Sequence, residues 1–239
     1  MHNLGLLGVH PSTIDAIVIS HGHYDHTGGL VPLLEQAAKT MPVYAHPNIF
    51  APRYSVAGGS QRYIGIPWTK EQLTSLGAKW RLSREPVQVI PGLVFGGEIP
   101  RLTAYETGDP NLVGALAGAD KNCGCGATTQ DPLPDDSALF YSTPSGLVVI
   151  GGCTHAGLVN TVRHGLNIMQ SPRLAGWIGG THLGPASAGQ KSATIEELTR
   201  LNPDFVAANH CTGFAMLAKL HHIFGDKFVA AGVGTVIDC

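Results

Sequence analysis

Short apolar segments alternate with longer amphipathic segments along most of the chain, and this alternation predicts a layered α/β protein. The apolar segments are rich in β-branched residues, which favour strands. We predict strands at residues 14–19, 42–45, 87–90, 93–95, 138–141, 147–150, 177–180, 205–208 and 228–230, with a last extended stretch at 233–237. We predict helices at about residues 30–39, 70–77, 157–169, 192–201 and 213–223.

Capping residues mark the start of two of these helices. Thr69 is the predicted N-cap of the second helix, and Ser192 or Thr194 lies near the cap of the fourth. Residues 50–70 have no regular pattern. Residues 106–136 are rich in Gly, Asp, Pro and Thr and have no apolar period, so we predict an exposed loop or insertion near the functional site.

Length and charge restrict the class of protein. The 239 residues suffice for one sizeable core, and we predict a single domain over residues 1–239. The formal net charge is −2 without a basic stripe, so we expect no nucleic-acid partner. Charged residues make up 13% of the chain, about half the usual share, which is compatible with burial of part of the surface in a homo-oligomer.

No segment predicts membrane insertion or secretion. No apolar stretch is long enough to cross a bilayer, and residues 1–5 lack a basic region followed by an apolar one. The five cysteines are odd in number and do not form a disulfide framework. We therefore expect a cytoplasmic protein with no membrane partner.

A dense group of potential metal ligands follows the first predicted strand. His21, His23, Asp25 and His26 lie within six positions, and neighbouring glycines permit a tight loop. Imidazole and carboxylate groups are ligands that zinc and other first-row divalent ions accept. A polar loop that happens to be rich in histidine is the alternative. We predict a metal site that holds one or two Zn²⁺ ions, with Mn²⁺ or Fe²⁺ as alternatives.

Histidines recur after other predicted strands. His21, His155, His182 and His210 each follow an apolar strand by a few residues. Open α/β sheets build their sites at the carboxyl ends of strands, so we expect these side chains to approach one another. A single histidine after a strand is more often a hydrogen-bonded core or loop residue.

Two cysteines, Cys123 and Cys125, are separated by one glycine. They could form a second metal or redox site. A single pair lacks the two-pair spacing of a structural zinc site, so a plain loop is the favoured interpretation.

The histidine motifs carry a resemblance to a known family. His21-x-His23-x-Asp25-His26 resembles the signature of the metallo-β-lactamase superfamily, whose αββα sandwich carries one or two metals. Four segments are similar to the branch named for 7,8-dihydropterin-6-methyl-4-(β-D-ribofuranosyl)aminobenzene-5′-phosphate synthase. They are residues 20–30, 152–157, 179–183 and 209–213.

The resemblance implies a ligand set. His21 and His23 would bind a first metal, whereas Asp25, His26 and His210 would bind a second. His155 is the best candidate for the remaining ligand.

The chain departs from the superfamily pattern at the bridging position. Cys153 stands where an aspartate is usual, which leaves the metal count open. His182 is a further ligand or a proton donor, and Asp25 could orient water. Glu98 matches a branch feature near the place of a usual histidine. Arg101 is a candidate partner for a substrate anion, since guanidinium pairs with phosphate, and a surface arginine is the equal alternative.

The start of the chain is a second departure. The family pattern has about two strands and an Asp-Thr-Gly loop before the first motif, whereas His21 lies only 20 residues from Met1. Either the start of the sequence is placed too late or the domain is genuinely truncated, and we therefore expect a fold short of its N-terminal strands. The sheet edge exposed in this way would favour association with another chain.

These features predict a metal-dependent hydrolase or synthase that acts on a small phosphorylated or ester-like molecule. A lactonase or β-lactamase-type hydrolase is the second enzyme hypothesis. A truncated, inactive metal-binding paralogue is the non-enzyme hypothesis.

Overall fold

The computed structural model of the chain describes residues 1–115 and 128–239. It divides into two compact units. The first unit comprises Met1–Leu82 and Asp109–Leu133, and the second comprises Ser83–Gly108 and Pro134–Cys239. The single domain inferred from the sequence stays a prediction. Cys123 and Cys125 lie outside the described residues.

A three-stranded parallel sheet forms the centre of the first unit. Its order is β1 (Ile17–Val18), β2 (Met41–Ala45) and β5 (Ala78–Leu82). The helices of this unit are α1 (His2–Leu6), α2 (Tyr24–Thr27), α3 (Leu30–Ala37) and α4 (Lys70–Ser75). Alternate residues of β2 are buried because side chains of a strand point to opposite faces. The core consists of buried side chains that include Ile19, Leu30, Leu34, Met41, Val43, Ile49 and Leu73.

The first unit also has a four-stranded antiparallel sheet. Its order is β4 (Arg62–Tyr63), β3 (Arg53–Ser55), β8 (Leu112–Ala115) and β9 (Thr128–Gln130). The exposed loop predicted for residues 106–136 was therefore wrong at β8 and β9, whereas the alternative, an insertion near the functional site, stays a prediction. Residues 50–70 are more regular than their pattern indicated. These strands are too short to show a period, and their sheet depends on pairing between distant segments.

The second unit is built on a seven-stranded mixed sheet. Its order is β14 (Phe228–Ala230), β13 (Phe205–Asn209), β12 (Leu174–Gly180), β11 (Gly146–Gly151), β10 (Ala138–Thr143), β7 (Leu93–Phe95) and β6 (Val87–Ile90). The four strands from β11 to β14 are parallel, so their carboxyl ends lie at one edge. The other neighbouring strands are antiparallel.

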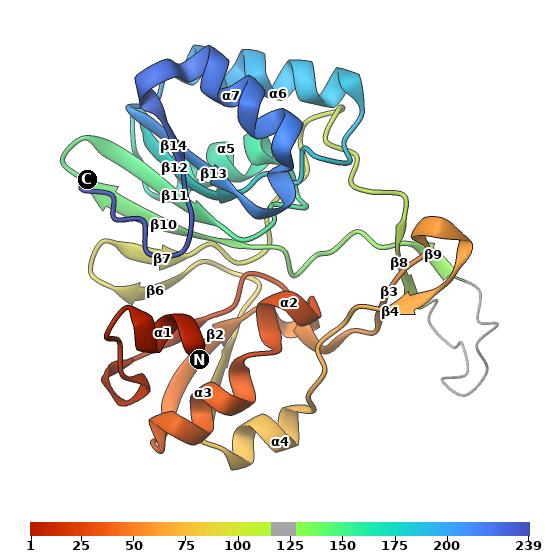
Figure 1. Cartoon of the computed structure of the whole chain (residues 1–239), viewed down its shortest axis with the longest axis vertical. Coiled ribbons are helices and arrows are strands. Elements are labelled where there is room, and N and C mark those ends of the chain that lie inside the picture. The colour runs from red at the N-terminus through yellow and green to blue at the C-terminus, as the bar shows by residue number, and fades with distance from the viewer. Residues whose placement is uncertain (116–127) are drawn as a thin grey trace. The chain divides into compact units, whose positions relative to one another are not determined.

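Three helices cover this sheet: α5 (Leu158–Ile168), α6 (Ala188–Leu201) and α7 (Phe214–Phe224) (Figure 1). The second core joins buried side chains of these helices and of the sheet, including Phe140, Val149, Leu158, Val162, Trp177, Leu198, Val206 and Leu220. Parallel neighbouring strands need a crossover connection, which is usually a helix, and the helices of these connections form a layer on the sheet.

Capping decides two helix starts. The cap at Thr69 is confirmed, because its hydroxyl accepts a hydrogen bond from Gln72 N–H and the Gln72 side chain accepts one from Thr69 N–H. Helix α6 begins earlier than predicted, because the Ser187 hydroxyl accepts from Gln190 N–H. The predicted caps Ser192 and Thr194 thus lie inside the helix.

The C-terminal segment and the lengths of the helices complete the description of the fold. A turn lies at residues 233–234, so the extended stretch predicted at 233–237 was wrong at its start. None of the helices seen in residues 1–115 and 128–239 is long and apolar enough to cross a membrane.

Candidate metal centre

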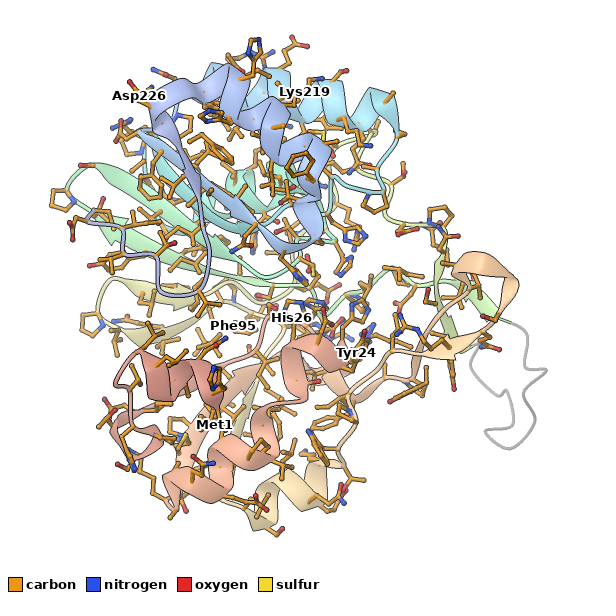
Figure 2. The ribbon with its side chains drawn as sticks, viewed as in Figure 1. Met1, Tyr24, His26, Phe95, Lys219 and Asp226 are labelled. Carbon is orange, nitrogen blue, oxygen red and sulfur yellow. The ribbon has the colours of Figure 1, made fainter. Side chains whose placement is uncertain are left out.

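The motif histidines of the first unit lie between a strand exit and a short helix. After β1, the Ile19 N–H donates to Tyr44 O at 2.9 Å and continues the pairing with β2. Helix α2 begins at Tyr24, with His23 as its N-cap. Figure 2 shows Tyr24 and His26 on this helix. The motif is therefore held at the carboxyl edge of the parallel sheet.

The imidazoles of this motif approach one another closely. A hydrogen bond of 3.1 Å joins His21 Nε2 and His23 Nδ1, and both residues are buried. The ring centroids of His21 and His26 lie 4.2 Å apart. His26 Nε2 is 3.6 Å from Asp25 Oδ2, and the Asp25 side chain is 39% exposed. The first unit thus gathers three imidazoles and one accessible carboxylate. We define these four residues as the motif cluster.

A second group lies at the carboxyl ends of β11, β12 and β13. One ligand atom each of Cys153, His155 and His182 lies within 4.8 Å of the others. The same holds for Cys153, His210 and Cys211. The rings of His155 and His182 have centroids 4.2 Å apart. We define these five residues as the strand-end cluster of the second unit.

Three positions of the strand-end loops have left-handed backbone conformations. Thr154 has a φ of 64°, His182 of 46° and His210 of 52°. Non-glycine residues adopt this region at an energetic cost, and such positions concentrate at functional sites. The surrounding hydrogen bonds, such as Thr154 Oγ1 to Gly180 O at 2.7 Å, hold the loops in place.

The Cys211 thiol belongs to this hydrogen-bonded arrangement. Its Sγ accepts from His182 N–H at 3.3 Å and lies 3.5 Å from the Cys153 carbonyl oxygen. Hydrogen bonding with Cys153 and His182 lowers the pKa of Cys211, although burial opposes this effect. A thiol whose pKa is lowered is a better metal ligand, because the thiolate is the binding form.

A buried carboxylate lies beside the strand-end cluster. Asp136 is 1% exposed, and its Oδ2 accepts from Ala156 N–H at 2.8 Å. Burial raises the pKa of Asp136 to about 6, whereas hydrogen bonds from Ala156 and His155 and the charge of Arg101 lower it. Sequence reasoning missed this residue because it lies in a segment interpreted as a loop.

The two weaker candidates for substrate binding have other contacts in the second unit. Arg101 Nη1 donates to the carbonyl oxygen of His155 at 3.0 Å. Glu98 accepts from Arg84 Nη1 at 3.0 Å. Their contact with a substrate stays a prediction.

Cys211 was also missed by sequence reasoning, although its place directly after His210 was a usable signal.

The donor sets fit a divalent metal. Zinc–ligand bonds of about 2.0–2.3 Å place two ligands of one ion less than about 4.6 Å apart. The His21 and His23 nitrogen atoms, 3.1 Å apart, lie well within this limit, and the donors of the strand-end cluster, within 4.8 Å of one another in each group, are close to it. The donors are imidazole, thiol and carboxylate, which zinc accepts. The roles assigned from the sequence to His21, His23, Asp25, His26, His155, His182 and His210 stay predictions.

Comparison with known proteins places this chain among characterised folds. A sequence profile of the metallo-beta-lactamase superfamily matches residues 1–210. The chain is 31% identical over 243 aligned positions to the 7,8-dihydropterin-6-methyl-4-(beta-D-ribofuranosyl)-aminobenzene-5'-phosphate synthase of Methanocaldococcus jannaschii. This alignment covers 99% of the chain and 79% of the relative.

Solved structures agree in fold. The crystal structure of Tm1679, described as a metal-dependent hydrolase of the beta-lactamase superfamily, has a TM-score of 0.77 at 24% identity. The match covers 100% of this chain and 84% of the Tm1679 chain. Zn²⁺-bound PqqB from Methylobacterium extorquens has a TM-score of 0.52 at 14% identity, over 95% of this chain and 73% of PqqB. The predicted fold class is confirmed.

Proposed function

Because this chain belongs to the metallo-β-lactamase superfamily, we propose that it is a metal-dependent enzyme with a dinuclear centre. Its substrate would be a small phosphorylated or ester-like molecule. The phosphorylated class is favoured by the name of the archaeal relative, which contains a 5'-phosphate.

The observation that carries this proposal is the 3.1 Å approach of the His21 and His23 imidazoles. Both rings are buried in the first unit, and the two nitrogen atoms are close enough to bind the same zinc ion. Two neighbouring imidazoles of this kind are ligands that a shared divalent ion accepts. The neighbouring carboxylate of Asp25 and the imidazole of His26 extend the donor set.

We assign the ligands as the superfamily resemblance implies. His21, His23 and His155 would hold one ion, and Asp25, His26 and His210 would hold the other. A bound divalent ion lowers the pKa of water towards about 7 and polarises a phosphoryl or carbonyl oxygen.

Two side chains are assigned to proton handling. The Asp25 carboxylate is accessible and acceptor-only when ionised, so it can orient an attacking water or substrate hydroxyl. The His182 imidazole can donate a proton to a leaving oxygen, since imidazole is the side chain that most often serves as a general acid. Both roles rest on ordinary acid–base chemistry and on the superfamily resemblance.

The reaction is either hydrolysis or a synthase reaction of the kind named for the relative. In the second case an aminobenzene ribofuranosyl phosphate would displace a leaving group, such as diphosphate, from a methyl-substituted dihydropterin. The amine nitrogen forms a bond to the methyl carbon of the pterin, the bond from that carbon to the leaving-group oxygen breaks, and the leaving group departs with its electron pair. The proton that the amine nitrogen loses passes to solvent.

Metal analysis of native protein tests the proposal. We expect the wild type to retain at least about half an equivalent of Zn, Mn or Fe, since tight sites normally keep their metal. Loss of a residue that only hydrogen-bonds a metal ligand weakens metal binding by roughly 10–100-fold. The His21→Ala/His23→Ala variant loses two ligands, so its metal affinity should fall by more than this. The His222→Ala variant is the matched control, because this exposed histidine lies on α7. Wild-type protein that retains no metal would contradict the proposal.

An activity panel then separates the reaction classes. Purified metal-loaded protein is offered a generic phosphodiester, a lactone, nitrocefin, and the dihydropterin and aminobenzene pair with release of diphosphate as the readout. Turnover of the phosphodiester or of the pair supports the proposed substrate class. Turnover of the lactone or nitrocefin alone would instead favour the second enzyme hypothesis.

A further inference from the structure

One peptide unit in the second unit is held by charged side chains on both of its polar groups. This unit joins His155 to Ala156. Its carbonyl oxygen accepts from Arg101 Nη1 at 3.0 Å, and its N–H donates to Asp136 Oδ2 at 2.8 Å. Arg101 and Asp136 come from two different segments, so two distant parts of the chain converge on this bond.

Neutral side chains would suffice to satisfy a peptide group. A buried carboxylate is expensive to desolvate, and Asp136 is fully enclosed. Hydrogen bonds that involve an ionised partner are shorter and about twice as strong as neutral ones. The use of a guanidinium and a carboxylate therefore indicates that this peptide must stay in one orientation.

The rest of the same turn is fixed as well. Asn160 Nδ2 donates to Ala156 O at 2.8 Å, and Gly157 N–H donates to Thr154 O at 3.0 Å. Thr154 itself is left-handed, and its hydroxyl bonds Gly180 O. The backbone that carries the His155 imidazole is thus held by hydrogen bonds along the whole turn.

We propose that Asp136 and Arg101 are positioning residues that fix His155 for metal binding. The inference rests on the proposed function, because it takes His155 as a ligand. It gives Arg101 a role other than contact with a substrate anion, and it gives Asp136 a role that the sequence motifs do not include. Partners of this kind typically contribute 10–100-fold to metal affinity.

Metal affinity and cobalt spectroscopy test this inference. The proteins are wild type, Asp136→Ala, Asp136→Asn, Arg101→Met and Arg101→Lys. Zinc affinity is measured by competition with a chelator, and the Co²⁺-substituted proteins are compared by their visible absorption, which reports ligand geometry. We expect Asp136→Ala and Arg101→Met to bind zinc about 10–100-fold more weakly, with altered Co²⁺ bands. Asp136→Asn and Arg101→Lys keep a hydrogen-bonding group, so they should recover part of the loss.

The matched control is Arg173→Met. Arg173 Nη1 also donates to a backbone carbonyl, that of Ser145 at 2.9 Å, and Arg173 also pairs with an aspartate, Asp204. Arg173 directly precedes β12 and so lies at the amino end of that strand, whereas the strand-end loops follow the carboxyl ends. Its removal should leave zinc affinity within about twofold of wild type, since distant sites act independently.

Several results would overturn the inference. Wild-type affinity and spectrum in Asp136→Ala and Arg101→Met would show that neither residue positions His155. An equal loss in Arg173→Met would show only general loosening of the second unit. If Asp136→Ala does not fold, Arg101→Met decides the question. If the wild type binds no metal, the proposed function itself is refuted. If the wild type binds metal and the Asp136 and Arg101 variants bind it equally well, only the positioning role is refuted.

Discussion

Arg53 is among the largest side chains buried in the first unit, and its charge has a specific partner. It is 1% exposed, and its Nη1 donates to Asp131 Oδ2 at 2.8 Å. Its Nη2 donates to Asn48 O, and Asp131 Oδ1 accepts from Leu133 N–H. The pair connects strand β3 with the segment after β9. Desolvation makes such a pair a weak source of net stability, yet loss of one partner is costly.

We expect Arg53→Met to lower the free energy of unfolding by about 3–5 kcal/mol, because Asp131 would remain buried without its cation. Addition of Asp131→Asn should recover most of this loss, since the amide oxygen still accepts from Leu133 N–H. Urea denaturation measures both. Arg84→Met removes the exposed pair with Glu98 and should cost less than about 1 kcal/mol. Equal losses in Arg53→Met and Arg84→Met would contradict this account.

Sequence reasoning at the residue scale succeeded for local motifs and failed for remote partners. The close approach of His21 and His23 follows from their spacing directly after a strand. Nothing in the sequence pattern indicated that Asp136 is buried or that Arg53 pairs with Asp131. Aspartates in a polar segment are ordinarily solvated, and only contacts with distant residues distinguish these two.

At the scale of single elements, helix α5 has an unusual start. Its N-cap is Gly157, which offers no side chain, and the Glu106 carboxylate takes the place of a local cap. Glu106 Oε1 accepts from Val159 N–H and Oε2 from Asn160 N–H, both at 2.9 Å. A Cβ at residue 157 would lie 2.2 Å from Glu106 Cδ, so the glycine leaves room for this carboxylate. Burial raises the pKa of Glu106, whereas these hydrogen bonds lower it.

We expect Glu106→Gln to reduce the free energy of unfolding by about 1–3 kcal/mol, because the amide nitrogen would face a backbone N–H that then lacks an acceptor. The carboxylate also interacts favourably with the positive end of the helix. The measurement is urea denaturation followed by circular dichroism. Thr69→Ala, which removes the local cap of α4, should cost about 1 kcal/mol and serves for comparison. Glu106→Gln with wild-type stability would refute a capping role for Glu106.

Element prediction followed the strength of the local signal. The hairpin of β10 and β11 and the strand pair β6 and β7 agree with their apolar runs. Strand β12 begins at Leu174, earlier than predicted, because Ala175 and Gly176 extend a run in which every residue except Ile178 is buried. Strand β5 was missed because Lys79 and Arg81 interrupt its apolar pattern, although only its alternate side chains are exposed.

At the scale of the whole molecule, metal binding should be coupled to stability. A ligand that binds only the native state stabilises it by RT ln(1 + [L]/Kd), about 2.7 kcal/mol at a hundredfold excess over Kd. For a chain of this size, this free energy corresponds to a rise in Tm of roughly 5–10 °C. The thiol, imidazole and carboxylate donors of the two clusters are the groups through which this coupling would act.

We therefore expect chelator-treated protein to melt roughly 5–10 °C below the zinc-loaded protein in calorimetry. The His21→Ala/His23→Ala variant should show little or no rise on addition of zinc. The His222→Ala control should behave as wild type. The same rise in the double variant would place the stabilising ion elsewhere, and no rise in the wild type would contradict tight native-state binding.

The sequence by itself determined the α/β class, the family and the local grouping of the first motif, because each depends on periodicity or on spacing over a few residues. Only the tertiary structure decided which distant groups meet. It brought Cys153 and Cys211 into one cluster, set Glu106 on the start of α5, and placed Arg101 and Asp136 on the His155 peptide. The physical reason is that these contacts depend on strand order and register, which arise from the packing of the whole sheet and not from neighbouring residues.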